Sequence, residues 1–354
     1  MKYWVMTVNT ENTMWLVLDS RSNGGIETHV LELAKGLVQY GLDLTVVFLK
    51  DYGFHPLRES LLEAQIKTIS LDSGLGSLIK RLQKFKPALI HSHGYKAGLM
   101  CCLAAKITST VHCSTFHAGE PGKGKQALYD AIFRQSSRCN DRNFAVSADI
   151  AHRLPAESVV LDNFVSMPEY SPKAGHQIAF VGRLSKEKGP DRIISLGARM
   201  PKVRFDLYGD GPMAESLISK ATDNCHFHGN QYSMEAHWAK IDLLLMPSRH
   251  EGLPMAALEA MARGIPVIAF DVGALDKVIL SEQNGWLVMA DQIDQFQQKI
   301  ECWLTMDSDQ KDLFREAARS HIAGNFSVQK IMPLILDQYA KVSVVAPSCV
   351  AICK

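Results

Sequence analysis

The sequence predicts an α/β protein built from two doubly wound, Rossmann-like domains, each with a parallel sheet. Its 354 residues suit two domains of about 100–200 residues each. Short β-branched segments alternate with amphipathic helical segments, in two separate series, and that alternation is typical of right-handed βαβ units with helices on both faces of a sheet. Asn163–His176 separates the series with two prolines, a glycine and no sustained period, which predicts a linker.

The first series predicts a domain over residues 1–165. Its expected strands are Met14–Leu18, Leu44–Leu49, Lys67–Leu71, Ala88–Ile90, Thr110–Phe116 and Asn143–Val146. The expected helices between them are Ile26–Tyr40, Gly76–Phe85, Lys96–Lys106 and Lys125–Arg138.

The second series predicts a domain over residues 166–326. Its expected strands are Gln177–Val181, Val203–Tyr208, Cys225–His228, Leu243–Met246, Pro266–Phe270 and Trp286–Val288. The expected helices are Pro190–Arg199, Met213–Lys220, Met234–Lys240, Pro254–Arg263, Ile293–Leu304 and Ser308–Gly324. A last helix, Ser327–Val342, is expected to cross back to the first domain within a segment 327–354. The two sheets are expected to face each other across a ligand cleft at the carboxyl ends of their strands.

Composition excludes several classes of protein. Hydrophobic residues make up 47% and charged residues 21%, which is ordinary for a globular protein, and a net charge of +1 is too small for a nucleic-acid binder. No segment holds the roughly 20 apolar residues that a membrane-spanning helix needs, and the start lacks a signal-peptide pattern. We therefore expect a cytoplasmic protein. Ser77–Pro87 is basic and amphipathic, so it is either a solvated helix face or a peripheral contact with the inner membrane face.

Two loops of the second domain are candidates for binding a phosphorylated ligand. In Phe180–Pro190, Arg183 and Lys188 lie on one strand-to-helix loop, where two cations could hold a diphosphate. In Met246–Phe270, Glu251 comes before a helix and Glu259 lies inside it, so the two carboxylates could bind separate ligand hydroxyls. The N–H groups of Gly252–Met255 would face anionic oxygens at the start of that helix. An ordinary charged surface loop is the alternative for Arg183 and Lys188.

The first domain offers a glycine pair and a group of histidines. Gly24 and Gly25 lie between a strand and a helix, where backbone N–H groups could reach a phosphate, although a simple helix cap also fits. His91, His93, His112 and His117 lie at the ends of two strands and could donate to ligand oxygens or remain as core histidines. No carboxylate or cysteine accompanies them at ligand spacing, so we expect no metal site. Asp307–Ser308–Asp309 resembles a metal-binding DxD, but a helix N-cap explains it better.

Taken together, these stretches resemble the retaining glycosyltransferases of family 4, which have the GT-B fold. The resemblance covers nearly the whole chain, and its most specific motifs are the glutamate pair Glu251 and Glu259 and the GRL–EKG loop. It implies that Arg183 and Lys188 grip the donor diphosphate, that Glu259 binds the ribose and that Glu251 binds the transferred sugar. Gly24, Gly25, Gly252 and Leu253 would lie along the donor phosphates. His117 would lie beside the reaction centre, and Glu27 would face the acceptor.

The resemblance also implies a reaction. A hexose-type sugar would move from a nucleotide-diphosphate donor, most simply a UDP-sugar, to a saccharide or lipid-linked acceptor with retention of configuration. No cofactor or metal would be needed, and cell-surface polysaccharide or lipopolysaccharide synthesis would be the setting. Three alternatives stay open. A sugar-nucleotide epimerase of the same architecture would need flanking acid–base carboxylates, a nicotinamide oxidoreductase would need a GxGxxG loop, and a non-catalytic binding module would lack the cations or glutamates.

Overall fold

The computed structural model divides the chain into two compact units. It describes residues 13–22, 24–72, 74–117, 125–169 and 175–343. One unit comprises Met1–Asp162 and Ile331–Lys354, and the other comprises Asn163–Lys330. The start of the expected linker, Asn163–His176, is therefore part of the second unit. Phe164 and Val165 are buried there, and Val165 pairs with Ser327 in a parallel bridge. The predicted linker thus begins at the boundary between the units, and two of its apolar residues are buried in the second one.

The first unit is built on a seven-stranded parallel sheet in the order β3-β2-β1-β4-β5-β6-β7. Its strands are β1 (Met14–Leu18), β2 (Leu44–Phe48), β3 (Lys67–Ser70), β4 (Leu89–His93), β5 (Val111–Phe116), β6 (Arg142–Ala145) and β7 (Val159–Val160). Its helices are α1 (Gly25–Gln39), α2 (Pro56–Glu63), α3 (Leu75–Phe85), α4 (Tyr95–Thr108), α5 (Lys125–Ser136), the 3₁₀ helix η2 (Ser137–Cys139), α6 (Ala148–Arg153) and the greater part of α13 (Val328–Ala340).

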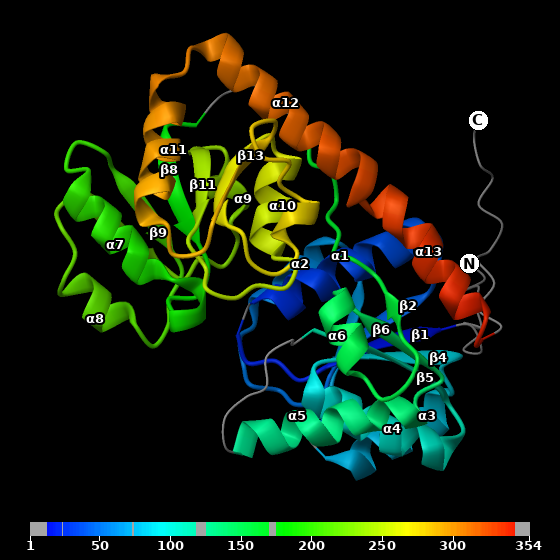
Figure 1. Ribbon diagram of the computed structural model, residues 1–354. Coiled ribbons are helices and arrows are strands. Elements are labelled where there is room, and N and C mark those ends of the chain that lie inside the picture. Colours follow the sequence, from blue (N-terminus) through cyan, green and yellow to red (C-terminus); the bar gives the residue numbers. More distant parts are fainter. Residues whose placement is uncertain (1–12, 23, 73, 118–124, 170–174, 344–354) are drawn as a thin grey trace, which may run out of the picture. The chain divides into compact units, whose positions relative to one another are not determined.

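Helices cover both faces of this sheet. Figure 1 shows α3, α4 and α5 along one face and α1 and α13 over the other. Leu78 and Leu82 of α3 pack with Trp15 and Val17 of β1. The apolar side of this basic helix is therefore used within its own unit, while Lys80 and Lys84 are exposed. The amphipathic pattern of Ser77–Pro87 thus reflects packing on the sheet.

The C-terminal helix α13 belongs to the first unit from Ile331 on. Tyr339 is buried, and its hydroxyl lies 2.6 Å from Nδ1 of His91 on β4. The other ring nitrogen of His91 lies 2.7 Å from the Thr115 hydroxyl. The sequence placed His91 and His93 after their strand, but β4 continues through His93. That prediction is wrong because the backbone of β4 pairs with β1 and β5 as far as His93, and side-chain hydrogen bonds satisfy the His91 ring inside the sheet.

The second unit is built on a six-stranded parallel sheet in the order β10-β9-β8-β11-β12-β13. Its strands are β8 (Gln177–Val181), β9 (Phe205–Tyr208), β10 (Cys225–Gly229), β11 (Ile241–Met246), β12 (Val267–Phe270) and β13 (Gly285–Val288). Its helices are η3 (Lys186–Lys188), α7 (Pro190–Arg199), α8 (Ala214–Ile218), α9 (Glu235–Trp238), α10 (Met255–Ala262), η4 (Leu275–Lys277), α11 (Ile293–Thr305) and α12 (Ser308–Asn325).

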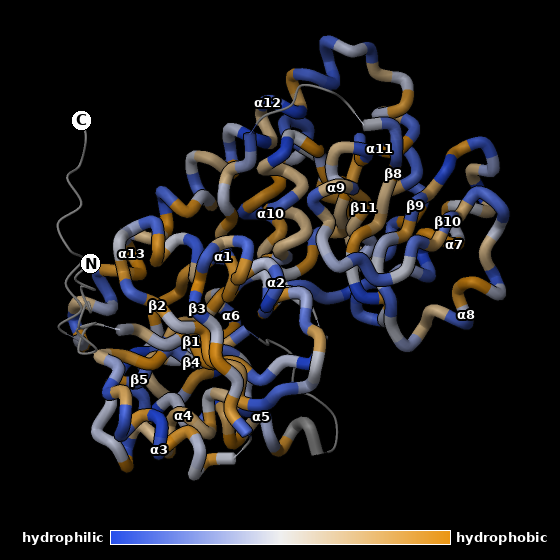
Figure 2. Tube along the Cα trace, turned by 180° about the vertical axis from the view of Figure 1, so that it is seen from behind, coloured by the Kyte–Doolittle hydropathy of each residue, from blue (hydrophilic) through white to orange (hydrophobic). Residues whose placement is uncertain are grey.

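Two hydrophobic cores lie on opposite faces of this sheet. One includes Ile193 of α7 and Trp303 of α11, and the other includes Leu258 of α10 and Ile322 of α12. Figure 2 shows hydrophobic residues along the strands and hydrophilic ones on the outer turns. Asp307 caps α12 in a reciprocal capping box with Gln310, as expected for the DxD-like triplet. The two-sheet α/β fold is thus confirmed, although the short elements α2, α6 and β7 were not predicted.

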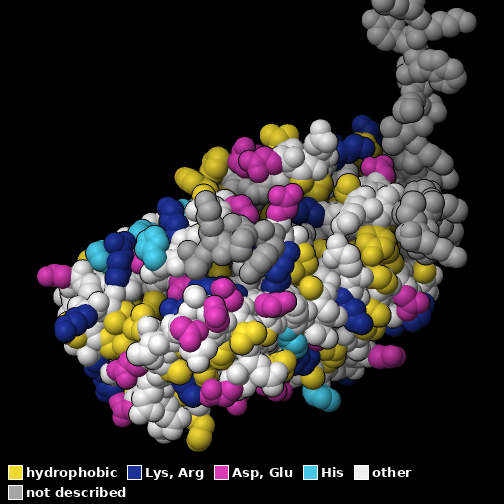
Figure 3. Space-filling view, turned by 90° about the horizontal axis from the view of Figure 1, so that it is seen from above, with side chains coloured by type: hydrophobic (Ala, Val, Ile, Leu, Met, Phe, Trp, Pro, Cys, Tyr) yellow, Lys and Arg dark blue, Asp and Glu magenta, His cyan; other side chains and the backbone are white. Residues whose placement is uncertain are grey.

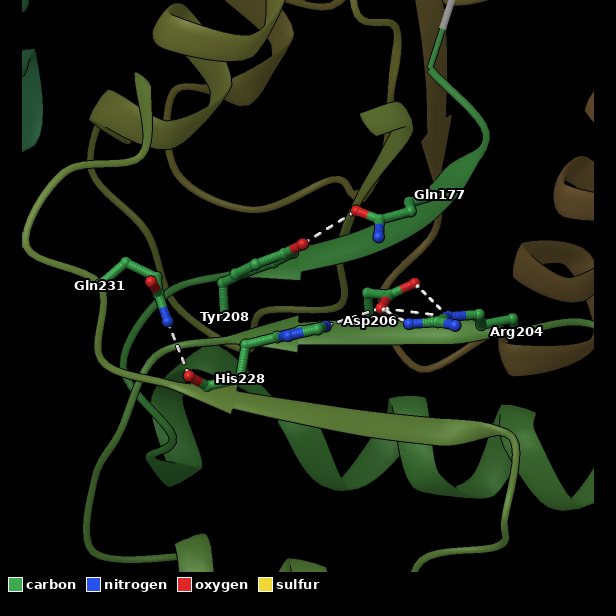
Figure 4. A network of polar contacts seen from close by, with 6 residues as sticks. All are labelled: Gln177, Arg204, Asp206, Tyr208, His228 and Gln231. Carbon is green, nitrogen blue, oxygen red and sulfur yellow. Dashed lines mark hydrogen bonds and ion pairs between the residues drawn. The ribbon is translucent and has the colours of Figure 1, made fainter. Parts of the chain in front are cut away.

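Polar side chains around a buried carboxylate on β9 connect the three strands at one edge of the second sheet. Asp206 is fully buried and accepts hydrogen bonds from the Arg204 guanidinium and from Nε2 of His228, at 2.7–3.2 Å. Tyr208 stacks on His228 and donates to Gln177 on β8, as Figure 4 shows. Burial alone would raise the pKa of Asp206, but the hydrogen bonds and charges of Arg204 and His228 outweigh it and hold that pKa below the ordinary value.

We expect Asp206→Asn to lower the free energy of unfolding at pH 7 by about 1.5–3 kcal/mol, the range for hydrogen bonds to charged groups. A depressed native pKa contributes stability above the unfolded pKa, and this contribution is lost as the pH falls through the native value. The difference between variant and native protein should therefore shrink below about pH 4. Urea unfolding at pH 7 and at pH 3.5 measures it, with Asp223→Asn on an exposed turn as control. An equal difference at both pH values would contradict the ionic role.

Candidate functional site

In the second unit, the loops after the strands β8, β11 and β12 pack backbone against backbone. Gly189 has a φ of +67°, and a Cβ there would lie 2.2 Å from the carbonyl oxygen of Pro247. Gly273 also has a φ of +67°, and its Cβ would lie 2.1 Å from the carbonyl oxygen of Glu251. Neither position can hold a side chain without moving its neighbour. The glycines therefore bring the loops carrying Lys188 and Glu251 together.

Lys188 and Glu251 form an ion pair across these loops. The Lys188 Nζ lies 2.6 and 2.7 Å from the two carboxylate oxygens of Glu251, whose side chain is only 4% exposed. The Ser248 hydroxyl donates to the same carboxylate at 2.7 Å. Lys188 itself remains 31% exposed, so its ammonium group is both fixed and accessible. From the sequence, Lys188 was expected to bind the donor diphosphate and Glu251 the transferred sugar. The sequence gave no indication that the two side chains pair.

Arg183 lies on the same loop as Lys188 and is exposed. The charges of Arg183 and Lys188 both lower the pKa of Glu187, which lies between them in the sequence. Burial by itself would raise the pKa of Glu187, but a 2.5 Å hydrogen bond from Ser185 and the charges of Arg183 and Lys188 leave that pKa below its ordinary value. The loop therefore concentrates positive charge at one strand end, as the diphosphate hypothesis requires.

A second ion pair fixes the same loops from outside. The Arg249 guanidinium contacts both carboxylate oxygens of Asp191 at 2.6 and 2.8 Å. Its hydrogen bonds, more than its charge, lower the pKa of Asp191. The backbone N–H of Arg249 also donates to the carbonyl oxygen of Glu187. The sequence reasoning passed over both residues, although Arg249 lies inside the motif that carries Glu251.

Helix α10, which carries Glu259, is partly exposed to solvent along one side only, called its open stripe below. Ala256, Glu259 and Arg263 are half-buried, while most of its other residues are buried. Gly252 and Leu253 precede the helix, and their carbonyl oxygens are already used within the unit, by Ala274 and Asn163. Glu259 therefore lies on the part of α10 that a ligand can reach. The loop that precedes the same helix carries Glu251.

In the first unit, α1 begins at Gly25, and Gly24 is its N-cap residue. Gly24 has an extended backbone with a φ of −168°, so neither a turn nor strain requires glycine there. A Cβ on Gly24 would lie 3.1 Å from the Glu27 carboxylate. That carboxylate accepts backbone hydrogen bonds from Gly24 and from Glu27 itself, and another from Ser20. Burial is the largest effect, and it raises the pKa of Glu27. The N-terminus of α1 is thus partly occupied by its own carboxylate.

His117 directly follows β5 and belongs to a compact histidine group. Nε2 of His117 lies 3.2 Å from Nδ1 of His93, and the ring of His29 on α1 lies 4.8 Å from that of His117 between centroids. Burial and the neighbouring histidines hold the pKa values of His93 and His117 well below the ordinary value, so both rings are neutral at pH 7. Ala118 and Gly119 of the motif lie outside the described residues.

The histidine group includes one residue that sequence spacing does not reveal. The sequence argument against a metal site rests on carboxylates and cysteines, none of which accompanies the strand-end histidines at ligand spacing, and it does not address a ligand set made of histidines alone. His29 lies with His93 and His117 so that one ligand atom from each falls within 4.8 Å of the others. Folding brings α1 to the ends of β4 and β5 and so supplies a third imidazole from a position distant in sequence.

A pocket of about 60 Å³ lies beside His117 in the described part of the first unit. Its apolar lining includes Phe116, Phe133 and Ile150. Arg134 and Arg153 add positive charge to the same pocket, and Asp130 adds one negative charge. The arrangement suits a ligand that combines apolar surface with anionic or hydroxyl groups.

Two parallel α/β units with charged strand-end loops are the architecture of GT-B glycosyltransferases. The chain matches the family model "Glycosyl transferases group 1" over residues 168–321 and "Glycosyltransferase Family 4" over residues 23–160. The protein therefore belongs to the GT-B glycosyltransferases of the family 4 type.

Relatives of known description agree with this family. The chain is 22% identical over 335 residues to the UDP-Gal:alpha-D-GlcNAc-diphosphoundecaprenol alpha-1,3-galactosyltransferase of Escherichia coli, covering 82% of this chain and 86% of the relative. It is 29% identical to the O-antigen biosynthesis glycosyltransferase WbnH of Escherichia coli, covering 66% of each. The crystal structure of Anabaena Alr3699/HepE in complex with UDP-glucose superposes with a TM-score of 0.81 at 18% identity, covering 93% of this chain and 99% of that one.

We expect a double-mutant cycle of Lys188→Met and Glu251→Gln to give a coupling free energy of about 1–3 kcal/mol without ligand, because each single change leaves a charged or polar partner unpaired. Urea unfolding of the four proteins measures it. The exposed pair Arg199–Asp294, 41% and 80% exposed, is the matched control and should couple by less than about 1 kcal/mol. Equal coupling in both pairs would show that Lys188 and Glu251 are not held together in solution.

Proposed function

We propose that this glycosyltransferase moves a hexose-type sugar from a UDP-sugar to a saccharide or lipid-linked acceptor, with retention of anomeric configuration. The observation that carries the proposal is the accessible ammonium of Lys188, held by the buried Glu251 at the strand ends of the second unit. A cation fixed in this way neutralises the charge that develops on a departing diphosphate. Arg183, exposed on the same loop, adds a second cation with forked geometry.

The carboxylates would select the donor. Glu259, half-buried on the open stripe of α10, is suited to accept hydrogen bonds from the two ribose hydroxyls. Glu251 has two oxygens shared among Lys188 and Ser248, and its remaining lone pairs could accept from hydroxyls of the sugar. Gly252 and Leu253, together with Gly24 and Gly25, would lie along the donor phosphates. Two relatives named for galactosyl transfer and O-antigen synthesis support a role in cell-surface polysaccharide or lipopolysaccharide synthesis.

The reaction needs no protein nucleophile. The bond between the anomeric carbon and the diphosphate oxygen breaks, and the acceptor oxygen bonds to the same face of that carbon. The acceptor proton passes to the departing phosphate oxygen. His117, neutral and beside the apolar pocket, would contact the donor sugar. Because cations of the chain neutralise the leaving group, we propose that turnover requires no divalent metal and no cofactor.

The acceptor would occupy the pocket beside His117. Its aromatic and aliphatic lining suits the apolar part of a lipid-linked saccharide, and Arg134 and Arg153 suit its phosphate. The relative that uses a diphosphoundecaprenol-linked acceptor supports this class of molecule.

Peripheral contact with the inner membrane face stays a prediction. No helix in the described ranges is long and apolar enough to cross a bilayer. Since the apolar side of α3 packs on its own sheet, such a contact would be electrostatic and would weaken as salt rises. On the face that Figure 3 shows, basic and acidic side chains are interspersed.

The alternatives receive less support. The relatives are transferases, which does not favour the sugar-nucleotide epimerase. The cations and glutamates that a non-catalytic binding module would lack are in place on the second unit. A nicotinamide oxidoreductase stays disfavoured by the missing GxGxxG in the sequence.

Lys188→Ala should weaken UDP-sugar binding roughly tenfold to hundredfold, because it removes a charge-assisted contact to the diphosphate. Lys186→Ala is the matched control, since Lys186 is an exposed lysine on the same 3₁₀ helix, and its affinity should stay within about twofold. Glu259→Ala should weaken UDP-sugar binding by a similar factor to Lys188→Ala. Calorimetric titration with UDP-sugars, GDP-sugars and NAD measures these affinities. Binding of NAD alone, or equal effects of the two lysine variants, would overturn the proposed donor site.

The anomeric configuration of the product should match that of the donor. Proton NMR of the first product formed reads it directly from the coupling at the anomeric centre. An inverted product would rule out same-face attack, while leaving the transferase activity itself intact.

A further inference from the structure

We propose that His29, His93 and His117 form a binding site for Zn²⁺ in the first unit. These side chains come from α1, from the last position of β4 and from the residue after β5. One ligand atom from each lies within 4.8 Å of the other two. Three histidines with an open fourth position are one of the recurring ligand sets of zinc.

The spacing of the rings fits one ion. The ring centroids are 4.8 Å apart for His29 and His117, and 5.5 Å apart both for His29 and His93 and for His93 and His117. Nδ1 of His93 and Nε2 of His117 are 3.2 Å apart. With Zn–N bonds of about 2.0–2.1 Å at tetrahedral angles, ligand nitrogens lie about 3.3 Å apart and ring centroids about 5 Å apart. The three ligand atoms lie within 4.8 Å of one another, so the side chains must rotate toward a shared centre to reach these bond lengths.

The bonding of His93 separates it from the structural histidines. His91, its neighbour on the same strand, uses both ring nitrogens in hydrogen bonds to Tyr339 and Thr115. His93 is 1% exposed, and its Nε2 has no hydrogen-bond partner among the described residues. Among the described residues, the polar contact of its ring nitrogens is thus the one between Nδ1 and His117, and its other neighbours are the rings of His91 and His29. A buried imidazole with so little bonding of its own gains more from a metal ligand than His91 would.

The site has a path for the ion. His117 is the least buried of the three and lines the pocket described above, together with Ile26 and Gly94. An ion bound at Nε2 of His117 would take that nitrogen away from a donor sugar. Zn²⁺ would then inhibit sugar transfer, with the metal-free protein as the active form. This last step rests on the proposed function, whereas the metal site does not.

Binding is tested on the full chain after treatment with EDTA, by competition with a chromophoric zinc chelator. One Zn²⁺ should bind per chain, and His29→Gln or His93→Gln should each weaken it at least tenfold. His152→Ala, which removes an exposed histidine of α6, is the matched control. The double variant Cys102→Ser and Cys139→Ser excludes capture by a pair of neighbouring thiols. Binding that survives both histidine changes, or is lost in the cysteine variant, overturns the site.

X-ray absorption of the native protein with Zn²⁺ decides the matter even if a histidine variant fails to fold. A shell of nitrogen ligands at about 2.0–2.1 Å supports the site, and sulfur ligands at about 2.3 Å overturn it. Sugar transfer is then measured with and without saturating Zn²⁺. Activity that falls with Zn²⁺ and returns with EDTA supports inhibition through His117, and activity unaffected by bound Zn²⁺ overturns it. A protein that binds Zn²⁺ but transfers no sugar would contradict only the proposed function.

Discussion

The donor site depends on one constraint. At the strand ends of the second unit, the backbone of one loop packs directly against the backbone of another. Gly189 lies against the carbonyl oxygen of Pro247, and Gly273 lies against that of Glu251, so a side chain at either position would separate the loops. Without that approach, Lys188 would not reach the carboxylate of Glu251. The ion pair between Asp191 and Arg249 secures the same loops on the outside. Chemistry at the site thus follows from packing of the main chain.

The pairing of Lys188 with Glu251 changes how ligand binding should be understood. A lysine on a free loop would lose side-chain entropy when it grips a phosphate. Here the ammonium is already fixed by a carboxylate that is almost fully buried, so that entropy has been lost during folding. An incoming diphosphate shares a cation that is already in position. On the other hand, the ligand must compete with Glu251 for the positive charge of Lys188. This competition lowers the affinity below the value that an unpaired lysine would give.

Most of the fold could be predicted from sequence, because hydrophobic periodicity reports which residues face a sheet. The strands β1, β8 and β11 and the helices around them follow that pattern closely. The pattern failed at β4, where His91 and His93 are polar yet buried, because their partners come from β5 and from α13 far along the chain. It also did not show that Phe164 and Val165, in the segment predicted as a linker, are buried in the second unit.

The site was predictable in its residue types but only partly in its contacts. Arg183, Lys188, Glu251 and Glu259 belong to recognisable motifs, and the structure places all four on strand-end loops or on α10. Which of them pair could not be deduced, since a hydrogen bond between residues some sixty positions apart leaves no local pattern. His29 was missed for the same reason. The helix α1, far earlier in the chain than β5, brings it to His117, and only the three-dimensional arrangement shows it.

The return of α13 to the first unit has a consequence for how the protein is made. The buried hydroxyl of Tyr339 completes the hydrogen bonding of His91 in the middle of the first sheet. A growing chain emerges from the ribosome amino end first, so the first sheet is synthesised long before the helix that closes its core. The second unit, whose residues Asn163–Lys330 are contiguous, can fold while synthesis continues. The half of the molecule that is translated first is therefore the half that matures last.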